Sequence, residues 1–559
     1  MIPKNIKNIL LTGLVGCAMG AALTACSDWD DHYGEAADAE GNSVGGATLW
    51  QLIKADPQLS DFSKVLEQTK MTRQRKKSSV SYADLLNGDQ SFTVMAPVNG
   101  TFDVDALLEK VETYKGDSAV ATTFIQNHLS RNICSMTDDT KNILLLNGKH
   151  AQMGGGMVDD VVIEEPNIRA SNGVLHITET QVPFKPNIFE ALTDMGEYQK
   201  IGEFLNGYTQ YKFYESASVS DGMIDGVKHY VDSVFYLQNK MLDQIGYINQ
   251  EDSTYWMVVP TEDEWNRVWE ETSKYFVYAS DVNKGDSLQQ YWTMRALLDD
   301  AVFNMNEQPS PEDSLCSVPY VKMKKGWTDE RMRYKQPEHH VFYEPYAEGG
   351  ILNGATELKL TNGSIWQTSK WPYTPERTFF KEVWTEGESV GMILSYDPTK
   401  CSYNPRYQVA DTISENGYLQ IVPASKTSAW DMTFRIDNTL SGDYDICVVL
   451  LPKSVNGITD DILPNKFKAT LTYFDEKGAK KTETFGAKQF KNDPLKVDTV
   501  VLKEGFHFPA CNKVSTTNQR VTLKIAISIN PTLENKKYSR EMYLDCIYLR
   551  PRTPKTEEE

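Results

Sequence analysis

Two kinds of hydrophobic pattern follow one another along the chain. Before residue 374, apolar runs that stop at a proline alternate with stretches whose apolar residues recur every three or four positions. The runs predict buried strands and the recurring stretches predict amphipathic helices. After residue 374, apolar and polar residues alternate, as in residues 521–529, which predicts half-buried strands. We therefore expect α/β domains followed by an all-β domain.

The strand–proline–helix pattern occurs twice. Residues 92–102 (FTVMAPVNGTF) form the first strand with its proline, and residues 172–177 (NGVLHI) form a later strand led by an Asn-Gly pair. Residues 254–261 (TYWMVVPT) and 361–366 (TNGSIW) repeat both features. The recurrence predicts two related domains in tandem.

These segments resemble the fasciclin domain, whose two signature strands they match in order. The resemblance covers residues 48–185 as a first domain and residues 186–373 as a longer, diverged second domain, with an insertion near residues 299–350. Thr178 and Glu179 depart from the Ile-Asp pair that is usual in the family. The resemblance implies two fasciclin-like α/β domains and a general role in adhesion or in binding proteins and glycans.

The C-terminal region is predicted to be a β-sandwich. Residues 374–552 contain many short strand runs with polar turns between them, including a hairpin signal at residues 475–478 (DEKG). The last run, residues 543–549 (YLDCIYL), resembles the closing strand of jelly-roll carbohydrate-binding and galactose-binding-like modules. The predicted fold class is thus α+β multidomain, ending in an all-β jelly-roll-like sandwich. Residues 553–559 are charged and are predicted to be a disordered tail.

The N-terminus carries a targeting signal. Lys4 and Lys7 precede an apolar stretch that is too short to span a bilayer comfortably, and Leu23-Thr24-Ala25-Cys26 follows. This sequence resembles the lipobox of bacterial lipoproteins, which implies removal of residues 1–25 and acylation of Cys26. The alternative is an ordinary secretory signal with a coincidental cysteine.

Residues 26–47, which follow the lipobox, bear on the cellular location of the protein. Residues 26–47 are small, polar and acidic, and they predict a flexible tether. The acidic run at residues 27–31 (SDWDD) resembles the export signal that places lipoproteins on the outer face of the outer membrane. We therefore expect a lipid-anchored, surface-exposed outer-membrane protein. The alternative is that the run is only a solvated acidic tether.

Charge excludes some partners. The 559 residues include 57 Lys plus Arg and 77 Asp plus Glu, a net charge of −20. An acidic protein repels phosphate, so no nucleic-acid partner is expected.

Cys447 and Cys546 stand in apolar runs and are predicted to be buried strand residues. The cysteine spacings contain no C-x-x-C pair and leave any disulfide pairing open.

The sequence predicts no catalytic or metal site. No phosphate-binding glycine loop and no H-E-x-x-H helix occurs, and no catalytic residue, metal ligand or cofactor is predicted. His339 and His340 are adjacent in sequence. Adjacent strand residues point to opposite faces, so we do not expect these two histidines to bind one metal ion together. His128 and His176 are predicted to be packed or hydrogen-bonded. Acidic pairs such as Asp299-Asp300 are predicted to be solvated surface.

Helix signals in the second copy predict core packing. Thr261 and Glu264 predict a capping box. Trp265 and Trp269 lie on one face of the helix that follows, and we expect them in the core.

Aromatic residues in loop-like stretches are the candidate ligand contacts. Sugar rings present apolar faces that stack on aromatic rings, while nearby polar side chains bind hydroxyl groups. The candidates are Trp327, Tyr343, Tyr346, Tyr403, Arg406, Tyr407 and Trp430.

The sequence therefore predicts a non-enzymatic surface lipoprotein that binds polysaccharide or protein. Such lipoproteins resemble accessory components of outer-membrane glycan-import systems, in which a TonB-dependent channel works with a lipoprotein lid. One alternative is an adhesin that attaches to host or neighbouring cells. A second alternative is a surface glycoside hydrolase or peptidase whose site the sequence does not reveal.

Overall fold

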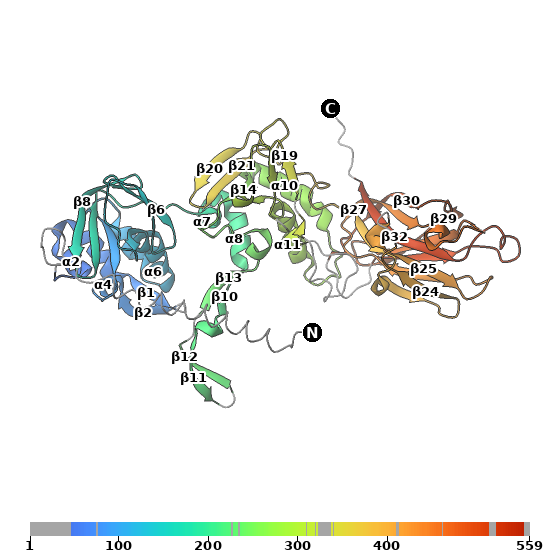
Figure 1. Cartoon of the computed structure of the whole chain (residues 1–559), viewed down its shortest axis with the longest axis horizontal. Helices are drawn as coiled ribbons and strands as arrows, with labels where there is room; N and C mark the ends of the chain where they lie inside the picture. The colour runs from blue at the N-terminus through green and yellow to red at the C-terminus, as the bar shows by residue number, and fades with distance from the viewer. Residues whose placement is uncertain are drawn as a thin grey trace, which may run out of the picture. The chain divides into compact units, whose positions relative to one another are not determined.

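The structure is a computed structural model, and it divides the chain into two compact units between Lys185 and Pro186 (Figure 1). It describes residues 46–73, 76–224, 227–232, 235–308, 310–318, 320–321, 337–338, 340–409, 413–460, 462–513 and 521–552. The predicted signal segment, Cys26, most of the predicted tether, residues 553–559 and the candidate residue Trp327 lie outside the described residues.

The first unit packs helices against one mixed sheet. Its helices are α2 (Leu49–Ala55), α3 (Ser60–Gln68), α4 (Tyr82–Leu86), α5 (Val104–Lys110) and α6 (Tyr114–Val120). A hairpin of β1 (Lys70–Arg73) and β2 (Lys76–Ser81) joins α3 to α4. The sheet runs in the order β4 (Leu129–Ser130), β3 (Phe92–Pro97), β9 (Gly173–Thr178), β8 (Val161–Ala170), β7 (Met157–Val158), β6 (His150–Gly154) and β5 (Lys141–Leu144). Only β3 and β9 pair in parallel among these described strands.

The second unit begins with a region of the same design. Its helices are α7 (Ile188–Asp194), α8 (Gln199–Gly207), α9 (Leu242–Ile245), α10 (Glu262–Ser273) and α11 (Gly285–Leu298). Its sheet runs β15 (Val302–Asn304), β14 (Tyr255–Pro260), β21 (Gly363–Thr368) and β20 (Thr356–Leu360), and β14 and β21 are parallel. The order β15-β14-β21-β20 matches β4-β3-β9-β8 position by position. The predicted recurrence is therefore present in the topology.

A buried asparagine occupies the same place in both regions. Asn172 Oδ1 accepts a hydrogen bond from Leu49 N at 2.8 Å, where α2 begins. Asn362 Oδ1 accepts from Ile188 N at 2.9 Å, where α7 begins. The following glycines have φ of +153° and +136°, and a Cβ on Gly363 would lie 1.8 Å from Tyr255 O. The Asn-Gly pair therefore ties the first helix to the parallel strand pair, where no side chain fits at the glycine.

The extra length of the second region lies in two places, not one. A β-ribbon occupies the α8–α9 connection, where the first unit has only the short β1–β2 hairpin. The ribbon consists of β10 (Thr209–Phe213) paired with β13 (Phe235–Asn239), and β11 (Val219–Ile224) paired with β12 (Val227–Asp232). The rest lies near the predicted insertion, in the pairs β16 (Ser314–Cys316) with β19 (Val341–Tyr343) and β17 (Tyr320–Val321) with β18 (Pro337–Glu338).

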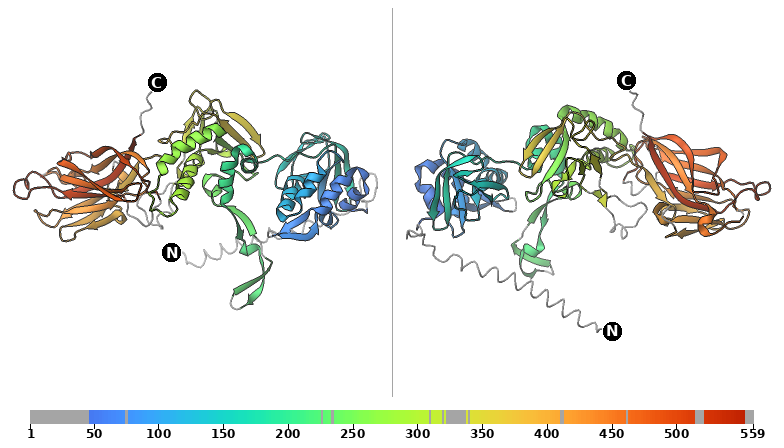
Figure 2. Two further views of the ribbon diagram at one scale, coloured as in Figure 1. Left: turned by 180° about the vertical axis from the view of Figure 1, so that it is seen from behind. Right: turned by 45° about the horizontal axis from the view of Figure 1, so that its top comes forward.

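The C-terminal region consists of two antiparallel sheets that face each other (Figure 2). One sheet runs β24 (Cys401–Arg406), β25 (Tyr418–Pro423), β32 (Met542–Arg552), β27 (Gly442–Leu450) and β30 (Asp498–Phe508), and β22 (Val383–Glu386) pairs with β32. The other runs β23 (Ile393–Tyr396), β26 (Asp431–Arg435), β31 (Thr522–Ile527), β28 (Lys466–Phe474) and β29 (Lys480–Lys491). Residues of both sheets share one apolar core. The prediction of mixed α/β regions followed by strands is confirmed.

Hydrogen bonds and a half-buried lysine join the sandwich to the α/β region of the same unit. Ser441 N donates to Tyr275 O at 2.9 Å, and Tyr278 Oη donates to Lys513 O at 2.9 Å. The Lys513 ammonium lies 4.2 Å from the Trp292 ring centroid. These contacts explain why the two regions form one compact unit.

Several local predictions are confirmed. The His128 ring is fully buried, and it lies 2.7 Å from Phe124 O through Nδ1 and 2.8 Å from Val182 N through Nε2. Burial lowers the pKa of His128 to about 4, so the ring is neutral at pH 7. Cys447 and Cys546 are buried in strands, and the Trp265 and Trp269 rings pack with centroids 5.8 Å apart.

The predicted capping box is wrong. Thr261 is the N-cap of α10 by position, but its side chain makes no capping hydrogen bond. Glu264 instead pairs with Arg267 and accepts a hydrogen bond from Trp371 N at 2.6 Å. The carboxylate therefore fastens α10 to the segment after β21, and this long-range contact replaces the local cap.

Within the described residues, no helix is both long and apolar enough to cross a bilayer.

Candidate functional site

One candidate ligand residue belongs to the core. Trp430 is buried, and its Nε1 donates to Arg540 O at 2.8 Å. A ring enclosed on both faces cannot stack on a ligand, so the prediction for Trp430 is wrong. The ring fills the space between the two sheets, and its one polar atom has a backbone partner.

Three further candidates do not form a common surface. Tyr403 packs against the core and against Tyr396, with ring centroids 5.1 Å apart. Arg406 lies on the same strand and donates to Gln420 Oε1 at 3.0 Å. Positions 403 and 406 differ by an odd number, so their side chains point to opposite faces. Tyr407 is exposed, and its hydroxyl donates to Glu388 O at 3.2 Å.

Tyr343 and Tyr346 lie together at an open hollow of about 500 Å³ in the second α/β region. Tyr343 is 73% exposed and Tyr346 is 44% exposed. The remaining lining residues are Glu312, Asp313, Glu344 and Ala347. The wall is held in place because Glu344 N donates to Asp313 O at 2.8 Å. We call this the tyrosine hollow.

Packing behind the tyrosine hollow holds one of its rings. Tyr346 packs edge-on against Trp366 with centroids 5.8 Å apart, and Trp366 packs against Trp256 at 5.2 Å. Burial and the nearby carboxylates of Glu357 and Glu312 raise the pKa of Tyr346, so its hydroxyl stays protonated at pH 7. The hollow therefore combines accessible rings, hydroxyl donors and carboxylate acceptors.

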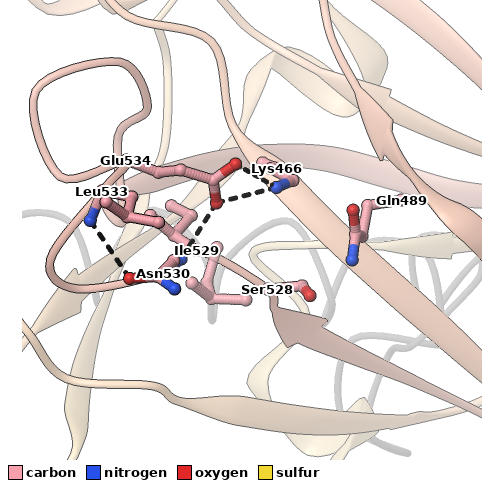
Figure 3. A pocket seen from close by; sticks show the side chains of 8 residues that line it. Lys466, Gln489, Ser528, Ile529, Asn530, Leu533 and Glu534 are labelled. Carbon is pink, nitrogen blue, oxygen red and sulfur yellow. Dashed lines mark hydrogen bonds and ion pairs between the residues drawn. The ribbon is translucent and has the colours of Figure 1, made fainter.

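A second hollow, of about 480 Å³, lies on the sandwich beside the ends of β28 and β31 (Figure 3). Its two charged groups are already paired with each other. Lys466 Nζ lies 2.6 and 2.7 Å from the two carboxylate oxygens of Glu534, and Asn530 N donates to Glu534 Oε2 at 3.0 Å. Lys466 also lies 5.3 Å from the Tyr538 ring centroid. A ligand would have to break this ion pair, so this hollow is the weaker candidate.

A buried carboxylate cluster lies on the sandwich where β22 meets β32. Glu386, Asp545 and Cys546 place one ligand atom each within 4.8 Å of one another, and Glu388 follows two residues after Glu386. A Cβ on Gly387 would lie 2.3 Å from Leu544 O, so only glycine allows this close approach of the two segments. The cluster is buried, and Glu388 is only 6% exposed.

The carboxylate cluster is electrostatically unfavourable by itself. Burial, with a smaller contribution from the charge of Glu386, raises the pKa of Glu388 to about 8 and that of Asp545 to about 7. Ser414 N donates to Asp545 Oδ1 at 3.2 Å, whereas Glu388 Oε2 has no hydrogen-bond partner among the described residues. The carboxylates of Glu386 and Asp545, with Glu388 next along the chain and one of its oxygens without a partner among the described residues, fit a hard divalent cation, since Ca²⁺ prefers oxygen ligands.

Sequence reasoning missed the carboxylate cluster, although it left a signal. Glu386-Gly387-Glu388 ends one strand, and Asp545 interrupts the apolar run of the last strand. Charged residues are almost never fully buried unless they are paired. An acid inside a strand that is otherwise apolar could therefore have been marked as a possible ligand.

The Asp299-Asp300 pair is not solvated surface as predicted. Asp300 is buried, it accepts from Ser317 Oγ at 3.0 Å, and it lies 2.8 Å from His340 Nδ1. Asp299 pairs with Arg295 one turn earlier on α11. The helix end turns inward at this point, so both acids find partners. His339 lies outside the described residues.

Comparisons with known proteins give weak likenesses. No family model matches the chain, and no curated protein matches it. It is similar to the enzymatically active domain of tailspike protein 4 from bacteriophage CBA120, with 10% identity, a TM-score of 0.18, and coverage of 30% of this chain and 19% of that one. It is similar to the CBM22-1–GH10 modules of xylanase 10B from Clostridium thermocellum, with 15% identity, a TM-score of 0.16, and coverage of 28% and 26%.

A third likeness spans more of the chain. It is to a FAS1 domain pair from the insect cell adhesion molecule fasciclin I, with 8% identity, a TM-score of 0.19, and coverage of 52% of this chain and 90% of that one. The chain spans less than a third of the tailspike and xylanase chains. None of these likenesses assigns a function to this chain.

Proposed function

We propose that the chain is a non-enzymatic, lipid-anchored surface protein that binds glycan at the tyrosine hollow. The observation that carries this proposal is the meeting of exposed Tyr343 and Tyr346 with three carboxylates around one opening. Aromatic rings bind the apolar faces of sugars, and carboxylates accept hydrogen bonds from their hydroxyl groups. The open shape suits a chain of sugars better than a small enclosed molecule.

The domain interpretation rests on topology. Two tandem fasciclin-like domains are supported by the shared strand order β4-β3-β9-β8 and β15-β14-β21-β20. A jelly roll is supported by eight strands whose neighbours run β25-β32-β27-β30 in one sheet and β26-β31-β28-β29 in the other. The α/β regions would then project the tyrosine hollow from the cell surface.

Replacing the two tyrosines should weaken glycan binding. We expect Tyr343→Ala with Tyr346→Ala to weaken binding at least tenfold, because about 1 kcal/mol or more is lost for each ring removed. Affinity electrophoresis of the full chain in gels containing different polysaccharides would find the ligand, and calorimetry would measure its affinity. Tyr247→Ala is the matched control, since Tyr247 is exposed to a similar degree at 43% in the same region. Equal weakening by the control would contradict the proposal.

The anchor is proposed from the lipobox around Cys26. Acyl chains hold a protein to the bilayer by burying CH₂ groups. We expect Cys26→Ser to move the chain from the outer-membrane fraction to a soluble fraction, and we expect protease added to intact cells to digest the wild-type chain. A Cys26→Ser chain that stays in the membrane fraction would refute lipid anchoring.

The accessory role in uptake is a further part of the proposal. A lipid-tethered glycan binder would raise the local concentration of glycan beside a TonB-dependent channel and its lipoprotein lid. Co-purification of the channel from detergent-solubilised outer membrane would support this role over that of an adhesin. Attachment to host or neighbouring cells that depends on the chain, without a channel partner, would favour the adhesin.

The buried carboxylates bear on the enzyme alternative. A glycosidase requires two close carboxyl groups, an acid whose pKa is raised and an ionised carboxylate that acts as nucleophile or base, and both must face the substrate. Asp545 and Glu388 are buried and line neither hollow described above. We propose that they hold a structural Ca²⁺ together with Glu386. The ion would neutralise charge that burial otherwise makes unfavourable.

A further inference from the structure

The tyrosine hollow carries negative charge without a basic partner. Three of its six lining residues are acids, Glu312, Asp313 and Glu344, and none of the six is a base. All three acids are exposed, and no lysine, arginine or histidine in the described part of the chain forms an ion pair with them. The described residues therefore leave the charge of the hollow uncompensated.

Charged groups elsewhere in the same unit do have partners. Arg377 lies against β19, but its guanidinium carbon is 4.3 Å from the Phe342 ring centroid, and its Nη2 donates to Val341 O at 3.3 Å. In the hollow on the sandwich, Lys466 neutralises Glu534. Of the two hollows, only the tyrosine hollow combines unpaired carboxylates with exposed aromatic rings.

Backbone hydrogen bonds hold the acidic wall in one shape. Glu344 N donates to Asp313 O at 2.8 Å, and Ala347 N donates to Glu344 O at 3.0 Å. The turn closes with Leu352 N donating to Pro345 O at 2.7 Å. A wall that is already fixed loses less conformational freedom when a ligand binds.

Glu344 adopts a backbone conformation that is unusual for its residue type. Its φ is +48°, in the left-handed region that glycine occupies more easily. Strained positions of this kind gather at functional sites, where the rest of the structure holds them in place. The strain brings a carboxylate to the wall of the hollow where a glycine would bring no side chain.

Charge decides which class of glycan fits. Uronic acids and sulfated sugars would be repelled by the three carboxylates, and neutral sugars would gain only stacking and neutral hydrogen bonds. A sugar ammonium group would form charge-assisted hydrogen bonds with a carboxylate and would be attracted to the face of a tyrosine ring. The raised pKa of Tyr346, to which Glu357 and Glu312 contribute after burial, shows that the potential at this ring is negative.

We propose that the tyrosine hollow selects glycans that carry free, unacetylated amino groups. Their ammonium groups pair with the carboxylates of Glu312, Asp313 and Glu344, while the apolar sugar faces stack on the two tyrosine rings. This inference rests on the proposed function, because it names the ligand class of the same site.

The test compares two oligosaccharides that differ only in the acetyl group. Hexamers of β-1,4-linked glucosamine and of β-1,4-linked N-acetylglucosamine are titrated into the full chain by calorimetry at pH 6, where the sugar amine is protonated. Exposed ion pairs are individually weak, so two or three together should make the free-amine hexamer bind about five- to tenfold more tightly in low salt. The ratio of the two affinities should fall toward one as salt is added, because salt screens exposed charges.

Substitution assigns the preference to the hollow. Glutamine keeps the size of glutamate and removes its charge, so Glu312→Gln with Glu344→Gln should reduce the ratio to about twofold or less. Glu203→Gln is the matched control and should leave the ratio unchanged, because Glu203 is an exposed glutamate on α8 that lines neither hollow. A preference for the amine that survives the double substitution would come from charge elsewhere on this acidic chain and would overturn the assignment.

The outcomes separate this inference from the proposed function. Equal affinity for both hexamers, lost when Tyr343 and Tyr346 are replaced by alanine, would overturn the amine preference and leave the glycan site in place. Tighter binding of an acidic polysaccharide such as polygalacturonate, or binding that needs added Ca²⁺ and ignores the amine, would overturn it in the same way. Binding of neither hexamer overturns the inference alone if another polysaccharide binds at the hollow, and overturns the proposed glycan site as well if none does.

Discussion

Calcium is expected to raise the midpoint of thermal unfolding of the second unit by about 3–4 °C at pH 8, and much less at pH 5. At a free concentration one hundred times its Kd, a ligand that binds only the folded state adds about 2.7 kcal/mol. At an unfolding entropy of about 2.1 cal/mol/K per residue, each kcal/mol shifts the midpoint of the second unit, residues 186–559, by about 1.3 °C. Calorimetry of the full chain with Ca²⁺ or with EDTA measures the shift.

The pH dependence follows from the raised carboxyl pKa values. The ordinary pKa values of a glutamate and an aspartate side chain are 4.5 and 3.8, and burial raises the pKa of Glu388 to about 8 and that of Asp545 to about 7 in the folded chain. Between the ordinary pKa values and the raised ones, the folded chain binds more protons than the unfolded chain. The free energy of unfolding therefore falls as pH rises. Without calcium, we expect stability to be lost from about pH 4 to pH 8. Calcium competes with those protons, so its effect is largest at pH 8.

Substituting Glu388 distinguishes a cation site at the buried carboxylates from the titration of acidic residues elsewhere in the chain. Glu388→Gln removes one buried charge, so we expect the calcium-free variant to be more stable than wild type at pH 8 and to show a weaker calcium response. Glu348→Gln is the control, because that side chain is exposed. Zn²⁺ in place of Ca²⁺ tests whether the Cys546 thiol is a ligand. A wild-type chain whose midpoint is the same with calcium and with EDTA at pH 8 would refute the cation site.

Sequence patterns located strands well because the signal for strands is local. The alternation in residues 521–529 became β31, and the Asp475–Gly478 turn joins β28 to β29, with Asp475 N donating to Ala479 O at 3.0 Å. The Asn-Gly pairs were visible for the same reason. The hydrogen-bond partners of these pairs could not be predicted, because Asn362 Nδ2 donates to Ile248 O, which lies more than a hundred residues earlier.

Sites were predicted less well because they join distant segments. The carboxylate cluster needs β22 and β32, which lie at opposite ends of the sandwich sequence. Trp430 was assigned to the surface because its neighbours look like a loop, yet its Nε1 finds Arg540 O across the core. Tyr343 and Tyr346 were chosen only as aromatic residues in an insertion. The carboxylates of Glu312 and Asp313, which complete their hollow, became apparent only from the pairing of β16 with β19.

Removing a buried asparagine is expected to be the most damaging single substitution in each unit. Asn172→Ala leaves Leu49 N without its acceptor, and it leaves Leu86 O and Gly88 O without the donor Nδ2, which lies 2.9 and 2.7 Å away. Each unsatisfied buried group costs about 1–3 kcal/mol, so we expect a loss of about 3–4 kcal/mol and a fall of about 10 °C in the midpoint.

The recurrence makes this prediction specific to one unit at a time. Asn362→Ala removes the same three bonds, to Ile188 N, Ile248 O and Gln250 O. We expect Asn172→Ala to lower only the transition of residues 46–185, and Asn362→Ala to lower only that of the second unit. Asn142→Ala is the control, because Asn142 lies on an exposed position of β5. If Asn172→Ala shifts its transition no more than this control does, the Asn172 amide does not hold the first helix to the parallel strands. The Asn-Gly pair would then recur in both regions only because the close contact between the strands requires the glycine.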